Sequence, residues 1–321
     1  MTGPGEFYEP LNGMDWPRFT GLPTFMRLPH VTDLDAVDIG LVGVPWDNGT
    51  TNRAGARHGP REIRNMSSLV RRTNPVSGLC PYELCRVADI GDASVNPIDV
   101  MDTLERVSAH FQHLHKAGVV PLSAGGDHLV SLPILRGIAA DGPVGMIHFD
   151  AHSDTWDTYF GGSKYTHGTP FRRAVEEELL DPKRTIQIGI RGSLFDLRDM
   201  DFARDAGMRI VTIEEYFALG WEKVMVEARR VVGDGPVYIS FDVDGLDPVY
   251  APGTGTPEIG GYSTHEAQQM LRATQGLDLV GGDVVEVAPP FDTSGNTALV
   301  GATMMFEILC VLADAFSRRA R

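Results

Sequence analysis

The sequence predicts an α/β fold built around a parallel β-sheet, and three observations lead to this prediction. The chain has 321 residues, of which 42% are hydrophobic and 22% charged, so it can bury a large core. From about residue 38 onward, short β-branched runs alternate with stretches of helical periodicity. Turn residues separate most of these segments. Strands that alternate with helices form parallel sheets with helices on both faces.

Eight segments are predicted as strands because they are short, apolar and rich in Val and Ile. They are residues 39–44, 86–90, 119–123, 144–150, 185–190, 208–213, 237–242 and 279–287. Amphipathic periodicity predicts helices at residues 100–117, 129–139, 170–180, 214–232, 263–275 and 297–317. An open doubly wound sheet and an eight-stranded barrel both fit this pattern, and both place ligands at the carboxyl ends of the strands.

The chain divides into a short arm and one domain. Residues 1–37 are rich in proline, glycine and aromatic residues, which predicts an irregular N-terminal arm suited to a contact with a neighbouring subunit. Residues 38–321 contain no interdomain linker and no internal repeat, so they are predicted to form a single catalytic domain.

Charge and cysteine content exclude several classes of protein. With 28 Lys and Arg against 43 Asp and Glu, the net charge is −15, which argues against a nucleic-acid partner. The three cysteines, Cys80, Cys85 and Cys310, suggest neither a disulfide framework nor a thiolate metal site. No basic and apolar leader is visible, and no apolar run approaches the roughly 20 residues that span a bilayer. We therefore expect a cytoplasmic protein without a membrane partner.

Side chains that can bind metal follow three of the predicted strands. Because side chains alternate along an extended chain, residues 150, 152 and 154 can point to one side. Each segment alone could be a helix cap or a polar turn, but the carboxyl ends of parallel strands meet at one edge of a sheet. The candidate ligands are His128, Asp150, His152, Asp154, Asp242 and Asp244.

The mixture of side chains narrows the metal and the reaction. Four carboxylates and two imidazoles without a thiolate favour Mn²⁺, with Ni²⁺, Co²⁺ and Zn²⁺ as alternatives. Six ligands are more than one ion takes from a protein while keeping room for water. Two ions bridged by carboxylates use them better and ease the ionisation of a shared water. The sequence therefore predicts a binuclear hydrolase.

Three segments resemble, in order, the signatures of the ureohydrolase (arginase and agmatinase) superfamily. They are Gly-Gly-Asp-His at 125–128, Asp-Ala-His-Ser-Asp at 150–154 and Ser-Phe-Asp-Val-Asp-Gly-Leu-Asp-Pro at 240–248. The resemblance extends from about residue 40 to residue 312. It implies a three-layer α/β/α arginase-like fold with an eight-stranded parallel sheet instead of a barrel, and a binuclear manganese site.

The resemblance also implies how the six ligands are shared between two ions. The first ion would be held by His128, Asp150, Asp154 and Asp242. The second would be held by Asp150, His152, Asp242 and Asp244. Asp150 and Asp242 would then bridge the two ions.

Two more residues match positions in this family. His167 corresponds to the histidine that shuttles protons, and Glu286 to the glutamate that binds the guanidinium group, a planar cation that a carboxylate suits. Asp244 is expected to accept the hydrogen of the nucleophile, and Asp127 and Asp247 to orient ligands. The alternatives are a surface-loop histidine and a glutamate paired with an arginine.

Residues 21–29, 46–60 and 252–261 are most similar to bacterial guanidino-acid hydrolases of the agmatinase-like branch, which cleave 3-guanidinopropionate or 4-guanidinobutyrate. Tyr159 stands where the guanidinopropionases carry Tyr and the guanidinobutyrases tend to carry Met. Its bulky ring should shorten the pocket and favour 3-guanidinopropionate, with urea and β-alanine as products. Lys164, a tyrosine hydroxyl or a main-chain N–H could bind the carboxylate of the substrate, and Tyr159 could instead be structural.

Several alternatives stay open. The chain could be a 4-guanidinobutyrase or an agmatinase, whereas arginine fits the agmatinase-like pattern less well. Methylated guanidines and biguanides are further candidate substrates, and an inactive metal-binding subunit is the non-enzymatic alternative. The resemblance implies a small guanidino substrate and a homo-oligomer, a trimer or a hexamer.

Overall fold

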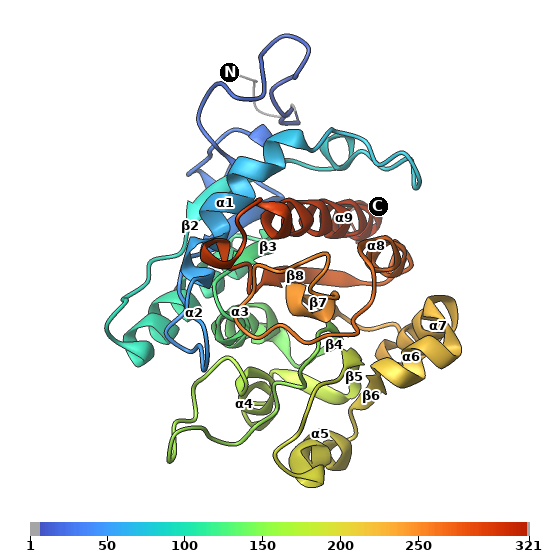
Figure 1. Cartoon of the computed structure of the whole chain (residues 1–321). Coiled ribbons are helices and arrows are strands. Elements are labelled where there is room, and N and C mark those ends of the chain that lie inside the picture. The colour runs from blue at the N-terminus through green and yellow to red at the C-terminus, as the bar shows by residue number, and fades with distance from the viewer. Residues whose placement is uncertain (1–6, 320–321) are drawn as a thin grey trace.

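The computed structural model describes residues 7–319, and within them the chain forms one eight-stranded sheet (Figure 1). All neighbouring strands pair in parallel, in the order β2-β1-β3-β8-β7-β4-β5-β6. The strands are β1 (Ile39–Val44), β2 (Val87–Asp92), β3 (Val120–Gly125), β4 (Val144–Phe149), β5 (Leu180–Ile190), β6 (Arg209–Thr212), β7 (Val237–Asp242) and β8 (Leu279–Val285). The predicted α/β class is confirmed, and the sheet is open because β2 and β6 are its edges. The first six residues of the predicted arm lie outside the described part of the chain.

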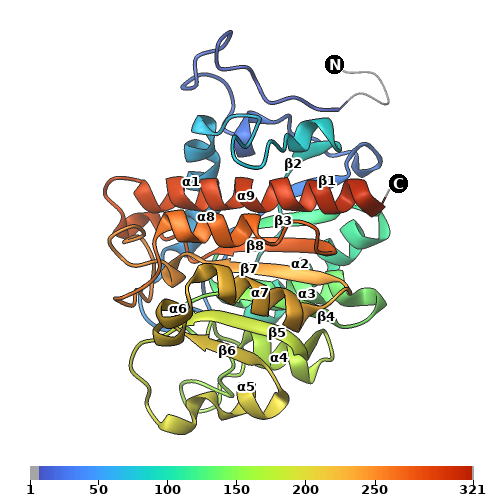
Figure 2. The same cartoon turned by 90° about the vertical axis from the view of Figure 1, so that its right-hand side faces the viewer.

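Helices cover both faces of the sheet and make three layers (Figure 2). One face carries α1 (Gly59–Met66), α6 (Ile213–Leu219), α7 (Trp221–Val232), α8 (Thr264–Arg272) and α9 (Asn296–Arg319). The other face carries α2 (Val100–Lys116), α3 (Ser131–Ile138) and α4 (Pro170–Glu176). The short α5 (Asp201–Ala206) packs beside β5 and β6. The fold is therefore the three-layer α/β/α arrangement and not the barrel, which the number of strands alone had left possible.

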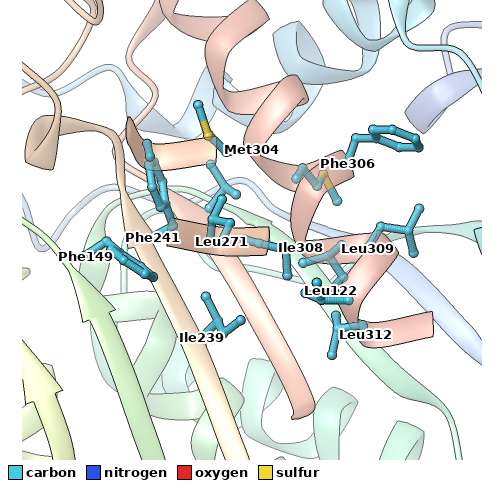
Figure 3. Packing of buried hydrophobic residues seen from close by; sticks show 14 of the residues in the cluster. Leu122, Phe149, Ile239, Phe241, Leu271, Met304, Phe306, Ile308, Leu309 and Leu312 are labelled. Atoms are coloured by element: carbon cyan, nitrogen blue, oxygen red, sulfur yellow. The ribbon is translucent and has the colours of Figure 1, made fainter. Parts of the chain in front are cut away.

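The strands β1, β4 and β7 are buried along their whole length, which explains their nearly continuous apolar sequences. In β7, Ile239 and Phe241 face the cluster that contains Ile308 of α9, whereas Tyr238 faces the cluster beneath α2 and α3. Figure 3 shows Ile239, Phe241 and Ile308 on the α9 side of the sheet. Toward the carboxyl end of the strand, the position on the α3 side is occupied by the fully buried Ser240. In β7 the apolar pattern thus gives way to a polar side chain beneath the edge where the ligands gather.

Helix α9 corrects two expectations, because it extends the predicted helix 297–317 to residues 296–319 and contains a stretch as apolar as a membrane span. An 18-residue stretch of it has a mean hydropathy of 1.9, which by length and composition alone would allow it to cross a membrane. However, 78% of this stretch is buried inside the protein, where α9 packs against α1, α8 and β8. Burial in the core accounts for its composition, because a core helix meets the same criteria.

Two helical predictions need correction, and two helices were missed. The predicted helix 214–232 is divided at Gly220, whose φ of 83° cannot continue an α-helix. The predicted helix 170–180 ends at Glu176 because the chain enters β5 at Leu180. The sequence also missed α1 and α5, which are eight and six residues long and too short for a clear helical period.

The loop that follows β3 passes unusually close to the end of β1, and a glycine permits this approach. A Cβ atom at Gly126 would lie 1.8 Å from the carbonyl oxygen of Trp46. The main chain at this point is held by bonds from Gly126 N to Val44 O (3.0 Å) and from Asp127 N to Trp46 O (2.9 Å). The position of His128, two residues later, therefore depends on residue 126 having no side chain.

We predict that Gly126→Ala lowers the free energy of unfolding by about 3 kcal/mol or more, because the main chain has to move to relieve the overlap. Urea unfolding followed by circular dichroism measures this change. Gly118→Ala is the control, because Gly118 has a φ of 73° but no atom within 4 Å of the added Cβ. That variant should lose only about 1 to 2 kcal/mol from backbone strain, and an equal loss in both variants would contradict the steric argument.

Candidate metal centre

The six predicted metal ligands lie together at the carboxyl ends of three strands, β3, β7 and β4. The strand order places β8 between β3 and β7, so Glu286, which follows β8, joins the same group. The side chains are buried except for that of His152, which is about one-third exposed. The ligands are His128 after β3, Asp150, His152 and Asp154 after β4, Asp242 at the last position of β7, and Asp244 in the 3-10 turn that follows.

Three carboxylate oxygens surround one nitrogen of His128. Its Nδ1 lies 3.1 Å from Asp150 Oδ2, 3.0 Å from Asp154 Oδ2 and 3.1 Å from Asp242 Oδ2. None of these contacts has hydrogen-bond geometry, and the buried Nδ1 has no hydrogen-bond partner among the described residues. One lone pair and three anions aimed at a common point fit a cation, so these residues match the predicted metal site.

The other nitrogen of His128 decides which tautomer the neutral ring adopts. Nε2 lies 2.8 Å from Ser240 Oγ, and this hydroxyl donates to Asp283 Oδ1 at 2.8 Å. Because Ser240 uses its hydrogen on Asp283, it must accept one from Nε2. The neutral imidazole therefore holds its hydrogen on Nε2 and presents a lone pair on Nδ1, which is the form that binds metal. Although burial opposes it, the three surrounding carboxylates raise the pKa of His128 well above its usual range, and a cation bound at Nδ1 would take the place of the second proton.

A second group of ligands shares Asp150 with the first. His152 Nδ1 lies 3.1 Å from Asp244 Oδ2 and 3.5 Å from Asp150 Oδ1, so the two oxygens of Asp150 face different histidines. This arrangement suits a carboxylate that bridges two ions. Asp242 directs Oδ2 toward His128, while its Oδ1 accepts a bond from Asp244 N at 2.8 Å. The second bridge, through Asp242, stays a prediction.

Crowding of buried carboxylates favours cation binding. Burial, with the neighbouring Asp244 and Asp150 carboxylates adding to it, raises the pKa of Asp242 well above its usual range. Burial also raises the pKa of Asp244, to about 6, although His152 opposes the change. A divalent cation reverses this effect, because it stabilises the ionised carboxylates.

Two residues of the site have backbone conformations that are rare for side chains larger than glycine. Asp154 has a φ of 52° and Glu286 a φ of 63°. Left-handed conformations at non-glycine residues cost roughly 1 to 3 kcal/mol each and cluster at functional sites. At both positions the unusual turn follows a buried strand and directs a carboxylate into the cluster.

His148, for which the sequence pattern had suggested no role, supports Asp150. His148 Nδ1 accepts a bond from Gln187 Nε2 at 3.1 Å, so the hydrogen lies on Nε2 and is donated to Asp150 Oδ2 at 2.7 Å. Although His148 lies among the ligands, it therefore orients one of them instead of facing the cation site. The sequence did contain a sign of this role. His148 interrupts an apolar strand and continues the alternation of Asp150 and His152.

His167 and Glu286 form a buried pair beside the cluster. Glu286 Oε1 accepts bonds from His167 Nδ1 (2.8 Å) and His128 N (2.9 Å), while within the described chain its buried Oε2 has no partner. Burial alone would lower the pKa of His167, but the Glu286 carboxylate, with smaller contributions from Asp127 and Asp154, raises it to about 9. This histidine can therefore hold a proton at neutral pH.

Asp127 and Asp247 hold loops in place, and their expected role of orienting metal ligands stays a prediction. Asp127 accepts bonds from Gly49 N (2.7 Å) and Leu129 N (3.0 Å), which caps the turn that carries His128. Asp247 accepts bonds from Val249 N and Gly260 N. The carboxylate oxygens of both residues therefore accept hydrogen bonds from main-chain N–H groups.

A cavity of about 290 Å³ opens beside the cluster and reaches His152, Asp244 and His167. Tyr159 lines it, as predicted for a residue that limits substrate length, whereas Lys164 is exposed and lies outside its lining. Glu286 is also not part of the lining. The cavity wall further includes side chains that the sequence did not single out, among them Thr51, Trp156, Arg191, Phe195, Asp199 and Glu258.

Comparison with known proteins gives consistent matches along the chain. Residues 37–311 match the family model described as Arginase family. Guanidinopropionase from Pseudomonas aeruginosa is 62% identical over 97% of this chain and 98% of its own, and guanidinobutyrase from the same organism is 49% identical over 98% and 99%. The solved structure of proclavaminate amidino hydrolase from Streptomyces clavuligerus superposes with a TM-score of 0.89 at 40% identity, covering 94% of this chain and all of that one.

We predict that Ser240→Ala weakens metal binding about 10- to 100-fold, because the Nε2 hydrogen of His128 loses its acceptor. Titration of the metal-free protein with Mn²⁺, followed by calorimetry, measures the affinity. Ser123→Ala is a matched control, since that buried strand hydroxyl has no hydrogen-bond partner within the described chain. Unchanged affinity in Ser240→Ala would contradict the role given to this bond.

Proposed function

The chain belongs to the arginase family, and on this premise we propose that it hydrolyses 3-guanidinopropionate to urea and β-alanine. The resemblance carried by the three signatures is thereby confirmed at the level of the family. The substrate is supported by 62% identity to guanidinopropionase over nearly the full length of both chains. The assignment as a hydrolase rests on two clusters of His and Asp side chains that have Asp150 in common. The hydrogen-bonded pair of His167 and Glu286 lies next to them.

We propose two Mn²⁺ ions as the cofactor, with Ni²⁺, Co²⁺ or Zn²⁺ as alternatives. The ligand set supports this choice, because it offers carboxylate and imidazole groups and no thiolate. The ions would be held as the sequence predicted, with His128 at one and His152 at the other. When bound, two divalent ions supply a readily ionised water and positive charge near the reacting carbon.

The residues beside the ions can bind and orient a guanidinium group. Glu286 is not part of the cavity wall, but its carboxylate contacts His167, which is. Its buried Oε2 has no described partner, and a guanidinium group that reaches it past His167, as a planar cation with several N–H donors, would satisfy it. Asp244 Oδ2 lies near the cavity and can accept the hydrogen of the attacking water. Together they would align the water oxygen with the guanidinium carbon, which is the main requirement for rapid attack.

His167 supplies the proton that the reaction needs. When the water oxygen bonds to the guanidinium carbon, the bond between that carbon and the alkyl nitrogen breaks. The departing nitrogen must gain a proton to leave as a neutral amine, and a histidine with a pKa of about 9 carries one at neutral pH. Glu286 stabilises the charged ring through Nδ1.

The wall of the cavity supports a short substrate. The hydroxyl of Tyr159 covers Gly168, where an added Cβ would lie 2.7 Å away, and the ring centroids of Tyr159 and Trp156 are 5.7 Å apart. A ring fixed in this way shortens the space behind the guanidinium group. Hydrolysis of 4-guanidinobutyrate is the nearest alternative, supported by 49% identity to a guanidinobutyrase.

Agmatine is a second candidate because two acidic residues, Asp199 and Glu258, line the same cavity. An amine at the far end of the substrate could pair with either of them. Arg191 also lines the cavity, but it donates to main-chain carbonyl oxygens that include Asp244 O (2.7 Å) and Glu258 O (2.7 Å). Because its N–H groups already bind these carbonyl oxygens, Arg191 is less suited to bind a substrate carboxylate.

We further propose a cytoplasmic homo-oligomer, a trimer or a hexamer, with a small guanidino substrate and no nucleic-acid or membrane partner. Met14, Trp16, Phe19 and Leu22 in the arm are 60% to 92% exposed, which supports a subunit contact there. Cys80, Cys85 and Cys310 are free and buried, which suits a reducing compartment.

A urea-release assay tests the substrate. With 3-guanidinopropionate, 4-guanidinobutyrate, agmatine and arginine compared at equal metal content, we expect the highest kcat/KM for 3-guanidinopropionate. Shortening the pocket by one methylene should favour it over 4-guanidinobutyrate by about 10-fold or more. A preference for agmatine would move the assignment to the second candidate, and no urea from any of the four would support the non-enzymatic alternative.

The pKa of His167 predicts the alkaline limb of the pH profile. Because this pKa is raised to about 9, the protonated ring is present at neutral pH and is lost as the pH rises through that value. We therefore expect kcat to fall above about pH 9 and His167→Asn to lose about 10²- to 10⁴-fold in kcat. Steady-state assays with metal content monitored measure both effects. A wild-type kcat that keeps rising beyond this pH would contradict the acid role.

A further inference from the structure

The turn that follows β1, residues 47–51, contacts the loop that carries His128 and the loop that carries His167. Gly49 O accepts a bond from His167 N at 2.9 Å, and Gly49 N donates to Asp127 Oδ2 at 2.7 Å. A Cβ at Gly49 would lie 2.9 Å from Asp127 Oδ2 and 3.2 Å from His167 N. The turn therefore lies directly against the main chain that carries His167.

Thr51, at the end of this turn, contacts the ring of His167 on the side opposite Glu286. Thr51 Oγ1 lies 2.7 Å from His167 Nε2, and Thr51 N donates to the same nitrogen at 3.1 Å. On the other side, His167 Nδ1 is 2.8 Å from Glu286 Oε1. Thr51 and His167 also both line the cavity. The ring is thus held at both nitrogens, by residues far apart in the sequence.

We propose that Thr51 is a positioning residue for His167, an inference that rests on the proposed function. Protonation of the ring changes Nε2 from acceptor to donor, whereas Nδ1–H can donate to the Glu286 carboxylate in both states. Of the two groups that contact Nε2, the Thr51 main-chain N–H can only donate, whereas the Thr51 hydroxyl can donate or accept. It donates to Nε2 of the neutral ring and accepts from Nε2–H of the charged ring.

This role predicts an effect on the chemical step more than on substrate binding. A histidine that gives up a proton changes from donor to acceptor at Nε2, and a partner that adapts keeps the ring in the same plane. Without the hydroxyl, Nε2–H of the charged ring loses its acceptor and faces only the main-chain N–H of Thr51, which is another donor. The ring must then turn away. Small misplacements of a proton donor lower kcat while leaving ground-state contacts largely intact.

Three variants test the proposal. Thr51→Val removes the hydroxyl and keeps the shape and the main-chain donor, and Thr51→Ser keeps the hydroxyl. Thr50→Val is the matched control in the same turn, because Thr50 Oγ1 has no hydrogen-bond partner in the described chain. We expect Thr51→Val to lose about 10- to 100-fold in kcat with KM changed less than about threefold. Thr51→Ser and Thr50→Val should stay within about threefold of wild type.

Two kinetic outcomes would overturn the proposal. One is a Thr51→Val enzyme with wild-type kcat, and the other is a Thr51→Ser enzyme as slow as Thr51→Val. Metal content measured on each variant separates positioning from misfolding, since loss of metal together with kcat in Thr51→Val would also overturn it.

A readout independent of catalysis separates this proposal from the proposed function. In zinc-loaded protein labelled with ¹⁵N-histidine, the Nε2 resonance of His167, assigned with His167→Asn, should move in Thr51→Val and stay in place in Thr51→Ser and Thr50→Val. This result would support the contact even if the wild type released no urea from any guanidine tested. An unmoved resonance in Thr51→Val would show that the hydroxyl does not hold the ring.

Discussion

The structure depends on a concentration of buried negative charge that a cation must offset. Three carboxylate oxygens lie within about 3 Å of a histidine lone pair, and a fourth carboxylate, Asp244, faces His152 nearby. Buried like charges without partners are costly. The site can hold them because four central strands fix the ligands in place and because two divalent ions would neutralise them.

Hydrogen bonds beneath the cluster decide which ligand atoms point toward the candidate cation site. Ser240 and Asp283 fix the tautomer of His128, and Gln187 and His148 direct Asp150. The ring of Phe171 from α4 packs edge-on against both imidazoles, with centroids 5.1 Å from His128 and 4.5 Å from His148. This support comes from strand positions that would otherwise be apolar, so the sheet provides rigidity and ligand orientation together.

The candidate metal ligands and the outer wall of the cavity come from different parts of the fold. The ligands follow strand ends, whereas Tyr159 and Phe195 in the cavity wall come from loops. Trp156 lies between these two aromatic rings, with centroid distances of 5.7 Å to Tyr159 and 5.6 Å to Phe195. Changes in these loops can therefore alter the shape of the cavity without disturbing the ligand cluster.

The sequence by itself determined the α/β class, seven of the eight strand positions to within two residues at either end, and the grouping of the ligands. It could do so because apolar runs and the alternation of Asp150, His152 and Asp154 are local patterns. The strand that differs most, β5, begins at Leu180, five residues before the predicted start. Only the tertiary structure decided that β8 lies between β3 and β7, which brings Glu286 beside His128. Strand order, the tautomer of His128 and the contact of Thr51 with His167 join residues more than 100 positions apart. No local pattern records such contacts, because they form only when the whole sheet is assembled.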